Sequence, residues 1–385
     1  MLLSTIAHSL AALTAASVIY YLVCIIAARR FFTDSVVGNP PLDCPPVTIL
    51  IPLCGADFKA LDNYASLCRQ DYPQCQIVFG VQDPGDSSIE VVRHLMERFP
   101  QKDIALVVSQ ETLGENPKVS NLHNMFSQAK HEHIVIMDSD VRVGSDFLRS
   151  ILAEFRDGEV GLVTCPYRAA EAPNLPSTFE AIGITGDFMP GVFVARLLEG
   201  VTFALGAAML TTRERLLSIG GFAAFADDLA DDYTLGNLIH KAGHEVRLSR
   251  YVVGTMPVHS SFRAMVRHQV RWARGTRICR PLSYMGVVIT HGTALGLLSM
   301  AAAGFSAPSM GLLFLVLAAR LTMAWTVGVS LLKDAILARN LWLLPLRDLL
   351  GFSIWCASFF GNTVEWRGKR FRLIRGGRLR PLNSA

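Results

Sequence analysis

The hydrophobic positions of the chain are continuous near its start and interrupted further along. Residues 2–28 carry no formally charged side chain, and a run of this length can cross a bilayer core as a helix. Arg29 and Arg30 follow it, so the positive-inside rule places its C-terminal end in the cytoplasm. A cleaved signal peptide fits poorly, because no basic residue precedes the run and the run is too long. We expect a transmembrane helix over residues 1–30.

Three more apolar blocks fill the last third of the chain. They cover residues 284–306, 309–332 and 341–361. Pro345, Arg347 and Asp348 interrupt the third block, so we expect it to be interfacial or re-entrant rather than a simple span. Arg320, inside the second block, must either find a partner within the bundle or reach the lipid head groups. The blocks together predict a C-terminal membrane region over residues 284–361.

The middle of the chain alternates between strand-like and helix-like patterns. Short runs rich in β-branched residues cover residues 47–55, 75–83, 104–110 and 133–140. Residues 87–99 have the spacing of an amphipathic helix between two of these runs. Such alternation predicts an α/β domain with a mostly parallel sheet, in which ligands bind beyond the carboxyl ends of the strands. We expect this domain over residues 43–260.

Carboxylates follow two of the strand-like runs. Asp83 ends the second run, and Asp138 and Asp140 end the fourth. Like charges at strand ends are tolerated where a cation or a hydrogen-bonding ligand lies between them. An extended Asp-x-Asp can direct both carboxylates to one divalent ion that also contacts a diphosphate. An Asx-turn or a helix N-cap is the alternative interpretation of the same residues.

Other polar segments accompany these carboxylates. Lys118 and Asn121 fall in an expected polar loop, and residues 225–236 hold four aspartates. For the aspartates the alternative is a solvated acidic helix start. Residues 261–283 are basic and amphipathic and contain Trp272 just before a membrane block, which favours a segment lying at the bilayer surface. A plain stop-transfer stretch is the alternative for that segment.

Composition and charge narrow the class of protein. Hydrophobic residues form 51% of the chain and charged residues 18%, as expected for membrane segments joined to a soluble domain. The net charge of +4 is more than accounted for by the tail, residues 362–385, which has seven basic residues and no acidic one between 367 and 380. This tail is typical of a surface facing anionic lipids. Eight cysteines without a CxxC pattern indicate neither zinc nor disulfides, and nothing favours nucleic acid as a partner.

The motifs VQDPGD, MDSD, LADDYTLG and HQVRW occur in this order along the chain. In this the sequence resembles the family 2 and 21 type glycosyltransferases, and more closely the ceramide glucosyltransferases with their bacterial relatives in hopanoid biosynthesis. The signature of that group is three aspartate motifs followed by (Q/R)xxRW. The resemblance covers nearly the whole chain and implies a GT-A, Rossmann-like catalytic domain.

The resemblance also implies roles for individual residues. It assigns Asp83 to the uridine and ribose of a UDP-sugar, Asp138 and Asp140 to a divalent metal (Mg²⁺ or Mn²⁺) and the diphosphate, and Asp232 to the general base. Asp231 is the second candidate for the base.

The last motif corresponds to Arg271 and Trp272, beside the diphosphate and the acceptor. Lys118 or Arg271 would assist the metal at the diphosphate. His268 stands where the motif has Gln or Arg, with Gln269 one residue late, so either the histidine takes that role or the contact is weaker.

These inferences predict an inverting, UDP-sugar-dependent hexosyltransferase. It would move glucose or N-acetylglucosamine to the hydroxyl of a membrane lipid, either ceramide or a hopanoid polyol. We expect an integral membrane protein with a cytoplasmic catalytic domain, in the inner membrane of a bacterium. Two alternatives are a processive polysaccharide synthase, which normally needs more membrane crossings, and a non-catalytic scaffold, which should have lost one of the aspartates.

Overall fold

The computed structural model describes residues 2–34, 44–155, 158–366 and 368–382. The chain divides into two compact units. One, here the sheet unit, comprises residues 35–170, 201–256 and 378–385. The other, here the helical unit, comprises residues 1–34, 171–200 and 257–377. Residues 171–200, which the sequence analysis placed in the α/β domain, belong to the helical unit. Residues 378–382 of the predicted tail belong to the sheet unit.

A seven-stranded sheet forms the centre of the sheet unit, in the order β3-β2-β1-β4-β8-β6-β9. The strands are β1 (Val47–Pro52), β2 (Cys75–Val81), β3 (Asp103–Val108), β4 (His133–Met137), β6 (Val160–Thr164), β8 (Ala208–Thr212) and β9 (Glu245–Leu248). The first four pair in parallel, whereas β8 runs antiparallel to β4 and β6. All six residues of β1 are buried, as expected for a strand covered on both faces. The predicted mostly parallel α/β sheet is confirmed.

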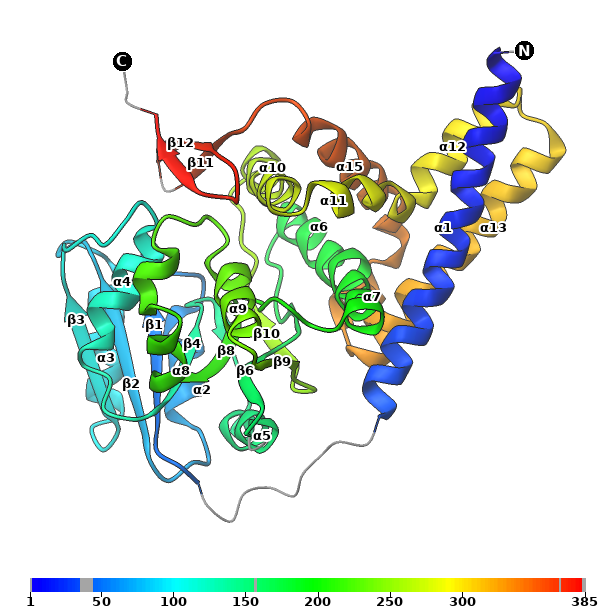
Figure 1. Cartoon of the computed structure of the whole chain (residues 1–385). Helices are drawn as coiled ribbons and strands as arrows, with labels where there is room; N and C mark the ends of the chain where they lie inside the picture. Colours follow the sequence, from blue (N-terminus) through cyan, green and yellow to red (C-terminus); the bar gives the residue numbers. More distant parts are fainter. Residues whose placement is uncertain (1, 35–43, 156–157, 367, 383–385) are drawn as a thin grey trace. The chain divides into compact units, whose positions relative to one another are not determined.

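Helices cover both faces of this sheet and create two apolar cores (Figure 1). The helices are α2 (Ala60–Cys68), α3 (Ser88–Arg98), α4 (Pro117–Phe126), α5 (Phe147–Glu154), α8 (Arg213–Ser218), η2 (Gly221–Phe225) and α9 (Asp231–Lys241). Phe79 and Phe147 lie in one core, and Leu122, Phe222 and Ile239 lie in the other. Close packing in the two cores holds the strands in place, and with them the side chains that follow the strand ends.

A small second sheet lies just past β4. It joins β5 (Val141–Arg142), β10 (Val253–Thr255) and β7 (Tyr167–Ala169). The backbone N–H of Met256 donates to the carbonyl of Asp140 at 3.0 Å. This pairing holds the backbone that follows the Asp138–Asp140 segment. A last strand of the chain, β13, covers Leu379–Pro381.

Within the described residues of the helical unit, three helices are long and apolar enough to cross a membrane, and a fourth is added if one bent pair is counted. The three are Ser4–Thr33, Leu175–Glu199 and Ala307–Leu331, and the pair, bent by 66°, is Pro281–Thr290 with Gly292–Ala302. Figure 1 shows α1 (Leu2–Thr33) beside α12 (Gly292–Ala302) and α13 (Ala307–Met323). Tyr21 of α1 donates to the carbonyl of Thr290 at 2.9 Å, which ties the first helix to the bent pair.

The candidate spans are built in part from shorter elements. These are α6 (Leu175–Gly183), η1 (Ile184–Phe188) and α7 (Met189–Glu199), then α11 (Pro281–Gly286) and η3 (Val287–Thr290), and η4 (Ala324–Leu331). Other elements of the helical unit are α10 (Phe262–Cys279), α14 (Ala335–Arg339), η5 (Leu341–Leu343), α15 (Leu344–Ser358), β11 (Thr363–Trp366) and β12 (Lys369–Leu373). The third apolar block forms η5 and α15, and its interfacial or re-entrant placement stays a prediction.

Arg320 is paired inside the bundle. It is 1% exposed, and its guanidinium donates to Asp348 at 2.7 Å and to Asp187 at 2.6 Å. Of the two possibilities left by the sequence, the structure therefore selects an internal partner. Asp187 lies in the apolar helix 175–199, a segment that the sequence analysis included in the α/β domain of residues 43–260.

Candidate functional site

Asp138 and Asp140 follow the carboxyl end of β4, where the strand pattern placed them. The N–H of Asp138 continues the sheet by donating to the carbonyl of Ala207 at 3.2 Å, so the turn begins directly after it. The Asp138 carboxylate forms an ion pair with the Nζ of Lys118 at 2.7 Å. Asp138 thus lies where the strand passes into a turn, and its side chain is paired with a positive charge.

A second pair of carboxylates reaches the same lysine. Asp231 and Asp232 open α9, and the Asp231 carboxylate lies 3.2 Å from the Nζ of Lys118. Gly206 lies between Asp138, after β4, and Asp232, at the start of α9: a Cβ built there would be 3.0 Å from Asp232 Oδ2 and 3.5 Å from Asp138 Oδ2. Residues far apart in the chain therefore meet around one lysine and one glycine. The acidic start of α9 therefore belongs to the same cluster as Lys118 and Asp138.

The charges and the burial of the cluster shift the pKa values of Lys118 and Asp232. Burial by itself would lower the pKa of Lys118, but Asp138, Asp231 and Asp232 together raise it above its ordinary value, so the lysine stays charged. Burial, and then the charge of Asp231, raise the pKa of Asp232 from 3.8 to about 6. Asp232 thus becomes a carboxylate that exchanges its proton near neutral pH. Its Oδ1 accepts from the backbone N–H of Tyr233 at 2.7 Å, which leaves Oδ2 facing Gly206.

The carboxylates after β4 suit a divalent cation. Burial, followed by the charges of Asp138 and Asp57, raises the pKa of Asp140 well above its usual value. The charge of Lys118 and a backbone hydrogen bond oppose this rise only in part. Asp138, Asp140 and Asp57 carry hard oxygen atoms of the kind that Mg²⁺ and Mn²⁺ prefer. The binding of a divalent ion by Asp138 and Asp140 stays a prediction.

Asp57 is a member of the cluster that the sequence did not suggest. It follows β1, and the Ser139 hydroxyl, between the two motif aspartates, donates to its Oδ2. The signal in the sequence was present, because Asp57 follows a strand-like run just as Asp138 does. It does not end the run directly, because Gly55 and Ala56 separate it from Cys54.

Asp83 lies at the end of β2, the strand next to β1, as the strand pattern required. Its Oδ1 accepts from the backbone N–H of Gly85 at 2.9 Å and so shapes the Pro-Gly turn. Within the part of the chain that the structure describes, the ion-pair partners of Lys118 are Asp138 and Asp231, not Asp83. Asp86, three residues on, accepts from Gly55 N–H at 2.8 Å and from Ser88 N–H at 2.8 Å, which connects this turn to the loop after β1.

Lys118 and Asn121 lie on a helix, so the expected polar loop is wrong. Asn116 caps α4 by accepting from the N–H groups of Lys118 and Val119 at 2.9 and 3.2 Å, and Pro117 occupies the first turn. The Asn116 side chain also donates to the carbonyl of Asp228 at 2.7 Å. This hydrogen bond holds the start of α4 against the loop that leads to Asp231, and so places Lys118 near Asp231.

The HQVRW residues lie on α10 in the helical unit. His268 contacts Trp272 edge to face with ring centroids 4.4 Å apart, and Gln269 is buried. The guanidinium of Arg271 lies over the ring of Trp366 on β11, 5.6 Å from its centroid. Burial lowers the pKa of His268 to about 4, so its imidazole is neutral at physiological pH. The contact of Arg271 and Trp272 with the diphosphate stays a prediction.

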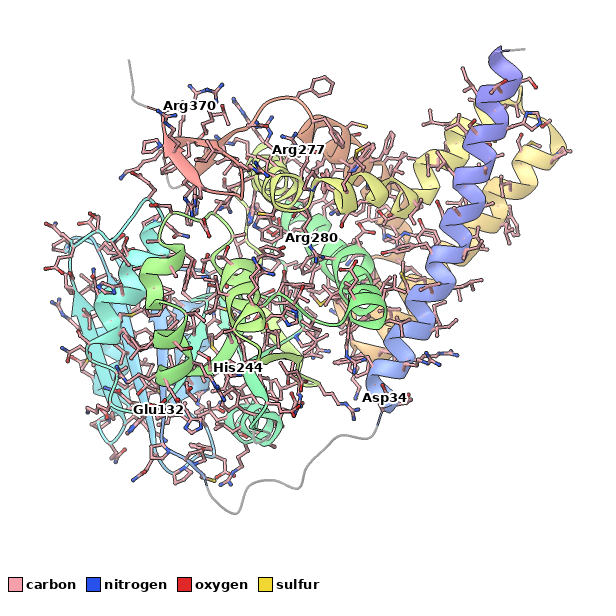
Figure 2. All side chains as sticks on the ribbon, viewed as in Figure 1. Asp34, Glu132, His244, Arg277, Arg280 and Arg370 are labelled. Carbon is pink, nitrogen blue, oxygen red and sulfur yellow. The ribbon has the colours of Figure 1, made fainter. Side chains whose placement is uncertain are left out.

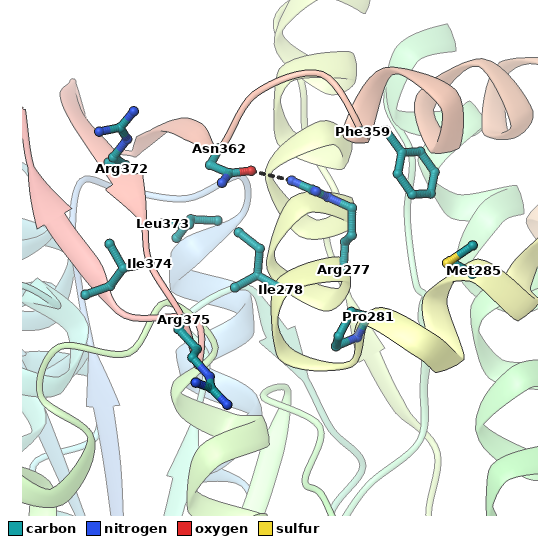
Figure 3. Close-up of a pocket in the computed structure, with 10 residues that line it drawn as sticks. All are labelled: Arg277, Ile278, Pro281, Met285, Phe359, Asn362, Arg372, Leu373, Ile374 and Arg375. Carbon is teal, nitrogen blue, oxygen red and sulfur yellow. Dashed lines mark hydrogen bonds between the residues drawn. The ribbon is translucent and has the colours of Figure 1, made fainter.

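Arginines from α10 and from the C-terminal hairpin gather in the helical unit. Figure 2 labels Arg277 and Arg280 at the end of α10 and Arg370 on β12. A pocket of about 650 Å³ is lined by residues of α10 and of the C-terminal hairpin region. Figure 3 shows Arg277, Arg372 and Arg375 in its lining, together with apolar side chains such as Ile278 and Phe359. Arg277 donates to the Asn362 side chain at the rim. Arg367 of the predicted basic tail lies outside the described residues.

Comparison with known proteins assigns the family. Residues 9–379 match the family model described as glycosyl transferase family 21. The chain belongs to glycosyltransferase family 21. Among the curated relatives of this family 21 glycosyltransferase is ceramide glucosyltransferase 3 of Caenorhabditis elegans, 23% identical over 349 residues that cover 88% of this chain and 74% of the relative. The ceramide glucosyltransferase of Candida albicans is 34% identical over 116 residues, 27% of this chain and 21% of the relative.

A solved structure supports the fold of the family 21 chain. The mannosyltransferase PcManGT of Pyrobaculum calidifontis, solved with GDP-mannose and Mn²⁺, has a TM-score of 0.57 at 21% identity and covers 93% of this chain and 99% of its own. The predicted GT-A-like architecture and the resemblance to ceramide glucosyltransferases are therefore confirmed.

Proposed function

We propose that the chain transfers a hexose from a UDP-sugar to the hydroxyl of a membrane lipid, with inversion at the anomeric carbon. The observation that carries the proposal is the cluster at the sheet edge. Lys118 binds Asp138 and Asp231, and Asp232 lies across Gly206 from Asp138 with its pKa raised to about 6. Such a cluster combines a positive charge, oxygen ligands and a proton acceptor at one edge of a sheet.

The donor side of the reaction needs charge stabilisation. A UDP leaving group accumulates negative charge on its diphosphate, and the Lys118 ammonium is positioned to offset it. A divalent ion held by Asp138 and Asp140, when bound, would supply further positive charge at the same oxygens. We assign the uridine and ribose to Asp83, which lies at the end of the neighbouring strand.

The acceptor side needs a base. A lipid hydroxyl must lose its proton as its oxygen bonds to the anomeric carbon and the bond from that carbon to the diphosphate breaks. Asp232 takes this proton, because a carboxylate with a pKa of about 6 is largely ionised at pH 7 and still basic enough to accept it. Asp231 is less suited, since Lys118 pairs with it at 3.2 Å. Direct attack in this way inverts the anomeric configuration.

The apolar helices favour a lipid as the acceptor. Three to four candidate spans bring the enzyme to a bilayer, and named relatives are ceramide glucosyltransferases. We propose ceramide or a hopanoid polyol as the acceptor and glucose or N-acetylglucosamine as the sugar. The other arginines of α10 and those of the β11–β12 hairpin would face anionic head groups at the cytoplasmic surface of a bacterial inner membrane. We assign Arg271 and Trp272 to the diphosphate and the acceptor.

Transfer assays with a matrix of substrates test this function. Purified protein in detergent is given labelled UDP-glucose or UDP-N-acetylglucosamine with ceramide or a hopanoid polyol, with and without Mn²⁺. The proposal expects label in one lipid, carrying a single sugar. A product carrying many sugars would indicate the processive synthase, and no turnover of either donor by folded protein would favour the scaffold.

A further inference from the structure

A group of metal-ligating side chains lies in the helical unit, separate in sequence from the aspartate cluster. Glu180, His259 and His268 each present one ligand atom, and these atoms all lie within 4.8 Å of one another. Glu180 comes from α6, His259 from the loop before α10, and His268 from α10 itself. Glu180 and His259 are buried, so solvent does not explain their association.

The geometry of the group is held by the backbone. The N–H of His259 donates to the Ser177 hydroxyl at 3.1 Å, and its carbonyl accepts from the Asn174 side chain at 2.9 Å. The imidazole Nε2 of His259 lies 2.6 Å from Glu180 Oε2. Residues nearly 80 positions apart are thereby fixed as neighbours before any ligand is considered.

One polar atom of the group has no partner. The Nε2 of His268 is buried and makes no hydrogen bond in the described structure. A buried polar atom left in this state costs about 1–3 kcal/mol. The ring packs instead against His259, with centroids 5.2 Å apart, and against Trp272. A cation that accepts lone pairs from the two imidazoles and the carboxylate would give all three residues a partner.

We propose that Glu180, His259 and His268 bind one transition-metal ion of the Zn²⁺ class. Two imidazoles and one carboxylate are a frequent set for zinc, whereas Mg²⁺ and Ca²⁺ prefer oxygen ligands alone. Ligand atoms on one tetrahedral zinc are about 3.3 Å apart, given bonds of roughly 2.0–2.1 Å. The observed spacing reaches this with small side-chain rotations. A water molecule completes the coordination.

The site gives a reason for the unusual first residue of the HQVRW motif. An ion at this position joins α6, the start of an apolar helix, to α10, which carries Arg271 and Trp272. His268 then serves as a metal ligand, which Gln or Arg at the same position would not replace well. The ion holds α10 against α6 and has no part in the chemistry at Asp138 and Asp140.

Cobalt spectroscopy tests the site without relying on transferase activity. The full chain in detergent is stripped with a chelator and titrated with Co²⁺, whose visible absorption becomes intense in four-coordinate sites with nitrogen ligands. We expect one such Co²⁺ per chain, displaced by Zn²⁺. His259→Gln and His268→Gln should lose the absorption and weaken Zn²⁺ binding by more than the roughly 10- to 100-fold typical of outer-shell changes.

Two controls make the result specific. His94→Gln changes an exposed histidine in the sheet unit and should keep the absorption. Asp138→Asn should also keep it, which separates this site from the proposed nucleotide-sugar site. Zn²⁺ should raise the melting temperature of the wild type but not of His268→Gln, and equal melting temperatures without metal would show that the variant folds. Absorption that survives in both histidine variants, or absence of bound metal in folded wild type, would overturn the proposal.

Discussion

Replacing Asp232 by Asn should abolish activity and at the same time stabilise the fold. In the folded chain, burial and the charge of Asp231 raise the pKa of Asp232 from 3.8 to about 6. The folded state therefore holds the Asp232 proton more tightly than the unfolded state does. Stability then falls as the pH rises from about 4 to about 6 and stays reduced above that range. An uncharged Asn avoids this cost at neutral pH.

The size of the effect follows from the pKa shift. A shift from 3.8 to about 6 corresponds to an upper limit of about 3 kcal/mol, at about 1.4 kcal/mol for each pKa unit. The Asp232 side chain is only partly buried, so solvent screening reduces this value and we expect a gain of about 1–2 kcal/mol at pH 7.5. Asn keeps the acceptor for the N–H of Tyr233, so helix α9 retains its first turn. The turnover number should fall by about 10²- to 10⁴-fold, the range typical of losing a general base.

Thermal unfolding in detergent at several pH values, beside a transfer assay, measures both effects. The melting temperature of Asp232→Asn should exceed that of the wild type at pH 7.5 and equal it below about pH 4. Asp103→Asn, which removes an exposed ion pair with Lys130, is the matched control and should change stability little. A variant that is less stable at pH 7.5, or a gain that persists unchanged at low pH, would refute the reasoning.

Further predictions concern the other members of the cluster. Lys118→Met should lower kcat/KM by at least about 100-fold because the diphosphate loses its nearest ammonium, which steady-state kinetics would show; a wild-type value would remove the lysine from the site. Chelation should stop transfer and Mn²⁺ restore it, with Asp138→Asn needing much more Mn²⁺; activity indifferent to chelators would exclude the metal. Gly206→Ala places a methyl 3.0 Å from Asp232 Oδ2 and should reduce activity while the fold survives, as circular dichroism would confirm. Asn116→Ala should cost about 1 kcal/mol from the lost helix cap, and unchanged thermal stability would contradict that assignment.

The strand ends of the sheet unit could be predicted from the sequence because their cause is local. Apolar β-branched runs end at Asp83 and Asp138, and the parallel sheet brings those ends to one edge. Asp232 was also within reach, since its motif has a fixed order in the family. Lys118 was placed in a loop because the cap formed by Asn116 and Pro117 was not recognised, although both residues are typical of a helix start.

The arrangements that could not be predicted depend on contacts between distant residues. The helix 175–199 has three acidic residues and two prolines, and the structure shows that one of those acidic residues, Asp187, is paired with Arg320, which lies more than 130 positions away. Likewise, the approach of His259 to Glu180 requires the backbone bonds around Ser177. A single sequence contains no periodic pattern from which such pairings can be read.

The measurement that tests the central claim most directly is the balance between UDP released and sugar recovered in lipid. Purified protein in detergent is incubated with labelled UDP-sugar, Mn²⁺ and the lipid acceptor, and both products are quantified for the wild type and Asp232→Asn. Our account predicts one mole of glycolipid for each mole of UDP in the wild type and almost none of either in the variant. Release of UDP with the label recovered as free sugar, or equal transfer by the variant, would contradict it.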